Sequence, residues 1–370
     1  MAVATNGVEL GLAWLESGAT DGKLEARFAR FGQDLAVLSE TVGVGRLVED
    51  EGISNDEFRQ IAVGALPQGW IVSVGHGATS ELITLDVGGR IVGSPRSIPV
   101  SGLTFASRPG GGPLLVWDEP IVDEDGGVGS AAAVDASADE LDAVRDVPPD
   151  TTGEVLPPSP TPARPTAVTK VAVLAADGAT MTNPVTVLRT DGLADRAVAF
   201  FGEGFLVASR VLTGIGIARV EIDGSPAASG PVLFDGELER PSLAWAGGKI
   251  HVAYGDFGGS PSRVYWAEVD RTGAVIGHPQ VLSDFRWTNI GALADDTLVL
   301  SGPFREAATA TELELGRLGA DGQARRDPIK VVRDPRGAEF ASAVVLGGDA
   351  VIAWMTGGCL GAIELARVAP

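Results

Sequence analysis

The sequence predicts an all-β chain built from repeated sheets, and three observations support this. The 370 residues include 50 Gly and 23 Pro, a content that disfavours a mainly helical protein. Short apolar runs of strand length alternate with Gly-rich turns along the whole chain. The turns at Gly178, Gly224, Gly273 and Gly322 are 46, 49 and 49 residues apart. A fixed period of ~40–50 residues with four short strands per unit is typical of a β-propeller.

Each unit has the same order of elements. A first apolar run meets a Gly-rich turn such as Asn6-Gly7, and a second run ends in Ala-Trp or an equivalent pair. A third run closes on an Asp-Gly-like turn, where Gly supplies the positive φ that tight hairpins need, and a fourth short run follows. We therefore predict a seven-bladed propeller with blades at residues 1–50, 51–100, 101–191, 192–236, 237–284, 285–334 and 335–370.

The second run of each unit aligns an aromatic column. "LGLAWLE" (10–16), "PLLVWDE" (113–119), "IHVAYGD" (250–256) and "AVIAWMT" (350–356) place Trp14, Trp117, Tyr254 and Trp354 at one position. We expect this column to pack between blades. The seventh unit stops at "AIELARVAP", after its third strand. It predicts either a three-stranded last blade or a chain cut from a longer protein.

The repeated phrase of a Gly turn, two apolar residues, Ala-Trp-x-Asp/Glu and a strand ending at Asp-Gly resembles the repeats of bacterial exported β-propeller proteins. The resemblance covers nearly the whole chain, on short and degenerate motifs, and implies the fold. The start of the sequence shows no basic-then-apolar signal peptide. We expect an exported or envelope-associated protein whose export signal has been removed, with a cytoplasmic protein as the alternative.

The charge balance selects the class of partner. Lys and Arg total 28 against 49 Asp and Glu, a formal charge of −21. This disfavours nucleic acid and anionic membrane surfaces, and it favours a basic protein, a cell-surface component or a cation. No apolar run reaches the ~18 residues of a membrane helix, so we expect no membrane insertion. The single cysteine, Cys359, excludes an internal disulfide and reads as a small structural residue.

Two acidic segments interrupt the repeat. Residues 118–160 hold 12 acidic residues and one Arg, and seven Pro lie between 148 and 165. We expect an insertion over 120–165 in blade three that forms a flexible loop, or alternatively a lid or partner-binding arm. The link between blades one and two should emerge on the same face. The predicted partner-binding residues are Glu49, Asp50, Glu51, Asp56, Glu57, Arg196 and Arg240.

Two sets of residues are candidate metal or catalytic groups. "VDEDGG" (122–127) resembles half of a calcium loop, with Asp123, Glu124 and Asp125 as oxygen donors. No twelve-residue loop with the right spacing follows, and the alternative is a solvated turn. Glu16, His76, Glu119 and Asp256 lie two residues past the aromatic column. They suit a divalent metal or acid–base chemistry, or they are simply the polar ends of strands.

The sequence therefore favours a non-enzymatic binding module that uses an acidic propeller face, with no catalytic residue assigned. Ca²⁺ is the one cofactor that it suggests. One alternative is a propeller-type hydrolase or lyase that uses the carboxylates and His76 on the same face. A second alternative is a structural subunit whose seventh blade leaves a sheet edge for another chain.

Overall fold

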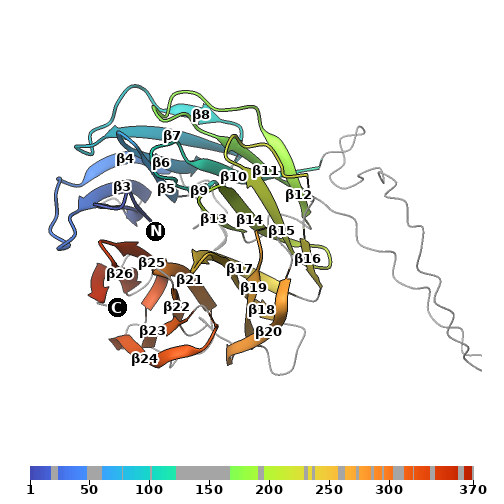
Figure 1. Cartoon of the computed structure of the whole chain (residues 1–370). Coiled ribbons are helices and arrows are strands. Elements are labelled where there is room, and N and C mark those ends of the chain that lie inside the picture. The colour runs from blue at the N-terminus through green and yellow to red at the C-terminus, as the bar shows by residue number, and fades with distance from the viewer. Residues whose placement is uncertain are drawn as a thin grey trace, which may run out of the picture.

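The computed structural model shows seven antiparallel sheets arranged as blades around a common centre (Figure 1). Each sheet consists of strands that follow one another in the sequence. The structure describes residues 1–17, 24–47, 61–76, 78–100, 102–121, 167–190, 196–228, 232–235, 238–256, 263–271, 275–284, 287–293, 296–302, 312–319, 321–333, 338–356 and 362–368. The prediction of a seven-bladed propeller is confirmed.

The first three blades hold twelve strands. Their bounds are β1 Ala2–Thr5, β2 Leu10–Ser17, β3 Leu24–Phe31 and β4 Val42–Leu47 in blade one; β5 Ile61–Leu66, β6 Gly69–His76, β7 Thr79–Asp86 and β8 Arg96–Ile98 in blade two; β9 Thr104–Ala106, β10 Leu114–Pro120, β11 Ala167–Val173 and β12 Val185–Thr190 in blade three.

The remaining four blades hold fifteen strands. Their bounds are β13 Arg196–Phe200, β14 Gly204–Val211, β15 Gly214–Glu221 and β16 Val232–Asp235 in blade four; β17 Leu238–Ala246, β18 Lys249–Asp256, β19 Arg263–Val269 and β20 Val275–Asp284 in blade five; β21 Trp287–Leu293, β22 Asp296–Gly302, β23 Glu312–Leu318 and β24 Ala324–Arg333 in blade six; β25 Ala338–Leu346, β26 Asp349–Thr356 and β27 Ala362–Val368 in blade seven.

The ring of blades closes by packing. The first strand of each blade lies against the first strand of the next, and β25 of blade seven lies against β1 of blade one. Blade one is a complete sheet in the order β1-β2-β3-β4, whereas blade seven has the order β25-β26-β27. The two ends of the chain therefore belong to neighbouring blades that exchange no strand (Figure 1).

The hydrophobic core lies between the blades. Seven apolar clusters occupy the seven interfaces: for example, Ala13 and Phe28 of blade one pack with Trp70 and Val72 of blade two. The last cluster joins Leu10 of blade one to residues of blade seven. Second strands such as β6 and β14 are buried on both faces because each blade has a neighbour on either side.

The aromatic column packs at these interfaces. Trp117, Tyr254 and Trp354 are at most 5% exposed, as the sequence predicts. Trp14 is only half-buried. It lies on the face of blade one that looks toward blade seven, beside Leu10 and Leu12 in the alternation of β2.

Candidate functional site

The two acidic segments leave the propeller at the same end. In an antiparallel meander, the second and fourth strands end where the first and third strands begin. One segment joins Leu47 at the end of β4 to Ile61 at the start of β5, and the other joins Pro120 at the end of β10 to Ala167 at the start of β11. We call this end of the propeller the acidic face.

Most of the predicted partner-binding and metal residues fall in these two segments. Glu49, Asp50, Glu51, Asp56 and Glu57, and the calcium candidates Asp123, Glu124 and Asp125, lie outside the described residues. The insertion that the sequence predicts over 120–165 likewise falls almost wholly in 122–166, which the structure does not describe. What the structure describes is where these segments attach.

The four candidate catalytic residues lie at the ends of second strands on the acidic face, each in a different blade. Glu16 Oε1 is 2.7 Å from Arg27 Nε on the neighbouring strand β3. Glu119 Oε2 is 2.7 Å from Lys170 Nζ on β11. These two carboxylates are about half exposed, and each is paired with a cation of its own blade.

His76 and Asp256 also face groups of their own sheets. His76 Nε2 is 3.6 Å from Glu81 Oε2 on β7, and Asp256 is opposite Arg263 in the register of β18 and β19. Within the described ranges, no group of three or more His, Cys, Asp or Glu side chains is placed to hold a metal ion. Glu16, His76 and Glu119 thus each face an oppositely charged or titratable group of their own blade.

A buried ion pair lies at the base of the insertion, and the sequence reasoning missed its carboxylate. Asp118 on β10 is 0% exposed, and its Oδ2 is 2.8 Å from Nη1 of Arg196 at the start of β13. Thr169 Oγ1 on β11 donates to Asp118 Oδ1 at 2.7 Å. Arg196 also donates to the backbone oxygen of Gly102. This cluster links β10 and β11, the two strands that flank the insertion, to the first strand of the next blade.

A signal for this pair was present in the sequence. Asp118 directly follows the column position Trp117, so strand alternation turns it toward the following blade. Arg196 begins the first strand of that blade. Arg196 was predicted to belong to a partner-binding surface, and its side chain is 9% exposed in this pair. Most of its guanidinium is therefore withdrawn from solvent.

Arg240 has a different environment from Arg196. It is exposed, it has a φ of 54°, and it lies in the interval between Glu239 and Ser242 where the pairing of β17 with β18 shifts register. A left-handed conformation at a β-bulge turns the local backbone out of the ladder. Of the two arginines in the predicted partner-binding set, Arg240 is the one on the surface.

His251 is a core residue, as its place in the alternation of its strand predicts. It is 0% exposed, and its Nδ1 is 2.8 Å from Oγ1 of Thr297 on the next blade. The ring of Trp266 meets it edge-on, with centroids 5.1 Å apart. Burial lowers the pKa of His251, with Glu268 opposing this effect and Lys249 adding to it. His278 is exposed.

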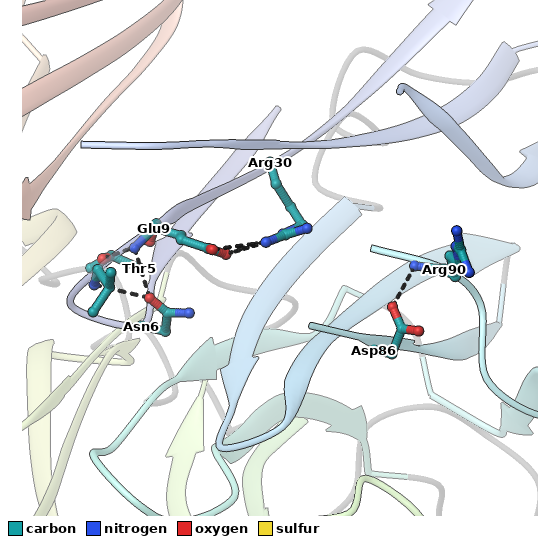
Figure 2. A network of polar contacts seen from close by, with 7 residues as sticks. Thr5, Asn6, Glu9, Arg30, Asp86 and Arg90 are labelled. Carbon is teal, nitrogen blue, oxygen red and sulfur yellow. Dashed lines mark hydrogen bonds and ion pairs between the residues drawn. The ribbon is translucent and has the colours of Figure 1, made fainter. Parts of the chain in front are cut away.

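The opposite end of the propeller carries ordered turns and a second kind of ion pair (Figure 2). Arg30 reaches both carboxylate oxygens of Glu9, with Nη2 2.8 Å from Oε1 and 2.7 Å from Oε2. Asn6 Oδ1 accepts from the backbone N–H of Glu9 at 2.8 Å. In the neighbouring blade, Asp86 Oδ1 accepts from the backbone N–H of Arg90 at 2.9 Å. These contacts fix the turns of blades one and two.

The same ion pair recurs at equivalent positions in three other blades. Lys249 pairs with Glu268, Asp296 with Arg317 and Asp349 with Arg367, always between the start of the second strand and the end of the third. Each of these four ion pairs is neutral as a pair, so the pairs add no net charge to this end.

Comparison with known proteins supports the fold. No protein-family model matches the chain, and no curated protein matches it. The uncomplexed acylaminoacyl peptidase of Pyrococcus horikoshii superimposes with a TM-score of 0.54 at 11% identity, over 99% of this chain and 50% of the peptidase. This chain thus spans about half the length of the acylaminoacyl peptidases that it matches.

A second solved structure matches over its full extent. The β-propeller domain of the Trilobed protease from Pyrococcus furiosus, which has an open velcro topology, superimposes with a TM-score of 0.53 at 10% identity. The match covers 100% of this chain and 95% of that domain. At such identities the likeness shows the seven-bladed propeller fold alone. No helix among the described elements could cross a membrane.

Proposed function

We propose that this chain is a non-enzymatic binding module, exported or envelope-associated, that presents its acidic face to a basic protein or cell-surface component. One observation carries the proposal: the two most acidic segments of the sequence are attached to the same end of the propeller. Two like-charged segments at one end create a negative potential that attracts cationic partners and steers their approach.

The charge count supports this surface. Residues 48–60 carry five acidic residues and one Arg, a net −4, and residues 122–166 carry ten acidic residues and two Arg, a net −8. Together they supply −12 of the formal −21. The four ion pairs of the opposite end add no net charge to it.

The strand-end residues support binding over catalysis. An enzyme of the hydrolase or lyase kind needs carboxylates that converge on one substrate atom. Glu16 and Glu119 instead hold cations of their own blades at 2.7 Å. Their pairing stabilises the rim from which the acidic segments leave.

The test uses a deca-lysine peptide as a probe of basic surfaces. We expect the chain to bind it, with an affinity that falls steeply as salt is raised because the contacts are ionic. A variant in which residues 121–166 are replaced by an Asn-Gly turn should bind much more weakly. Pro120 and Ala167 are direct cross-strand partners, so a two-residue hairpin can join them without disturbing blade three.

A second variant separates the charge of the segment from its length. It replaces the ten acidic residues of 122–166 with Asn or Gln while the length stays constant. Equal peptide binding by the parent, the turn variant and the neutral variant would contradict the proposal.

Calcium titration by calorimetry on the parent and the turn variant tests the one suggested cofactor. The "VDEDGG" stretch (122–127) predicts that any Ca²⁺ binding is lost with the insertion. Binding that persists in the turn variant would place the metal on the blades, near Glu16, His76 and Glu119. That outcome would favour the hydrolase or lyase alternative over the binding module.

A further inference from the structure

Among the described strands, the sheet of blade seven has three members, β25, β26 and β27, whereas each other blade has four. β27 pairs with β26 along one edge, and no described strand pairs with its other edge. None of its residues is fully buried, whereas β3, β7, β11, β15 and β19, the third strands of blades one to five, each bury at least four. An edge strand of this kind is a template for the addition of another strand.

In the other six blades, the fourth strand also covers the blade that follows. An apolar residue of each fourth strand belongs to the core cluster of the next interface: Val44, Ile98, Leu188, Phe234, Leu282 and Val331. The ring of Phe234, for example, is 5.4 Å from that of Tyr254, a member of the aromatic column. The fourth strand is thus the element that buries the column.

Trp14 is the column residue that faces blade seven, and no described fourth strand of blade seven covers it. It is half-buried, while Trp117, Tyr254 and Trp354 are at most 5% exposed. Its Nε1 donates to Glu16 Oε2 at 3.3 Å. Ile363 and Leu365, which alternate toward the same gap from β27, are half-buried as well. The gap between blades seven and one is therefore lined by an aromatic ring and two aliphatic side chains.

The sequence of β27 indicates which strand fits its edge. Glu364 of blade seven and Glu314 of blade six occupy equivalent positions on their third strands. Glu364 is opposite Trp354 and Glu314 is opposite Ser301, and these two partners are equivalent positions of the second strands. Both glutamates lie between aliphatic residues, in Ile-Glu-Leu and Leu-Glu-Leu. In blade six, Glu314 is directly opposite Lys330 of the fourth strand, within Ile-Lys-Val-Val. Opposite charges at facing positions stabilise a strand pair.

We propose that the outer edge of β27 binds an extended strand of a partner protein, in which a lysine lies between aliphatic residues. The added strand completes blade seven and places its lysine opposite Glu364. An aliphatic residue of that strand covers Trp14, as Val331 covers Trp354 in the preceding interface. This site is distinct from the acidic segments of the proposed function.

The probe is a labelled peptide of residues 327–334, Asp-Pro-Ile-Lys-Val-Val-Arg-Asp, which reproduces the fourth strand of blade six. In the intact chain β24 already occupies β23, so the free peptide has β27 as its available partner. We expect saturable binding by fluorescence anisotropy. Hydrogen exchange should slow in residues 362–368 when the peptide binds, and exchange in 312–318 should not change.

A charge reversal tests the register. Lys330→Glu in the peptide or Glu364→Lys in the protein should weaken binding roughly three- to tenfold, and the two changes together should restore most of it. Asp177→Lys, in an exposed turn of blade three, is the matched control with the same change of net charge. It should leave peptide binding unchanged.

Backbone methylation tests strand addition itself. In an added strand, alternate N–H groups point toward β27. One peptide is N-methylated at Ile329 and Val331, and a second peptide at Lys330 and Val332. One of the two peptides should lose binding, and the other should keep it. Equal effects of both pairs, slowed exchange in 312–318 instead of 362–368, or failure of the charge reversal to rescue would each overturn the proposal. The turn variant lacking 121–166 should bind the peptide as the parent does, so the two proposals fail independently.

Discussion

Asp118 and Glu119 are adjacent carboxylates on β10 with opposite environments. Asp118 is 0% exposed and contacts Arg196 and Thr169, while Glu119 is 45% exposed and contacts Lys170. A buried charge that loses its partner costs far more than an exposed one, because water cannot replace the lost contact. Asp118 is thus a structural carboxylate, and Glu119 is a surface carboxylate.

We expect Asp118→Asn to lower the free energy of unfolding by about 3–5 kcal/mol, because it leaves the guanidinium of Arg196 buried without its counter-ion. Glu119→Gln, the matched control one residue away, should change it by less than about 1 kcal/mol. Urea denaturation followed by tryptophan fluorescence measures both. Similar small effects would show that Arg196 does not depend on Asp118.

His251 predicts a pH dependence of stability. Burial lowers its pKa in the folded state below the ordinary value of 6.5, so the unfolded chain binds more protons near that pH. Its contribution to stability is therefore complete above pH 6.5 and is lost as the pH falls toward the folded pKa, by at most about 1.4 kcal/mol per pH unit.

Thermal unfolding between pH 5 and 8 measures this effect. His251→Gln should flatten the profile in the window just below pH 6.5 relative to the parent. His278→Gln changes an exposed histidine and should leave the profile as it is. A parent profile that His251→Gln does not alter would assign the pH dependence to other groups.

Strands of neighbouring blades pack a small residue of one strand against a large residue of the other. A Cβ at Gly11 on β2 would lie 2.6 Å from the ring of Trp70 on β6, in the interface between blades one and two. A Cβ at Gly43 on β4 would meet only the end of Arg27, at 3.6 Å. Neither glycine has a positive φ, so the two differ in space alone.

Gly11→Ala should destabilise the chain by about 1–3 kcal/mol, because the added methyl group forces Trp70 and its neighbours apart. Gly43→Ala should stay within about 0.5 kcal/mol of the parent. Chemical denaturation of the two variants provides the comparison. Equal stability of both would mean that the interface adjusts to the methyl group without cost.

The molecule is a ring held by seven similar interfaces, and at the interface of blades seven and one the described residues include no fourth strand of blade seven. The interface of blades seven and one relies on the cluster around Leu10, Leu346 and Val351 and on Arg367, which donates to the backbone oxygen of Gln33. The covering that Val331 gives to Trp354 has no described counterpart over Trp14. This interface should therefore be the weakest in the ring.

Hydrogen exchange of the whole chain tests this. We expect residues 362–368 of β27, bonded along one edge, to exchange faster than residues 263–269 of β19, which lies between two strands of its sheet. Adding the 327–334 peptide should reduce the difference. Equal protection of β27 and β19 in the free chain would argue that the outer edge of β27 is already covered.

The fold class, the number of blades and the buried role of three column residues can be predicted from the amino-acid sequence. They follow from strand alternation, turn chemistry and the ~40–50-residue period, which are local or repeated signals. The contacts between side chains of different blades come from the folded structure: Asp118 with Arg196, His251 with Thr297, and Trp14 with the gap beside β27. Such contacts join segments far apart in the chain, so they depend on how whole blades stack. The pattern within one repeat specifies the strands of each blade, and the stacking of the blades decides which side chains meet between them.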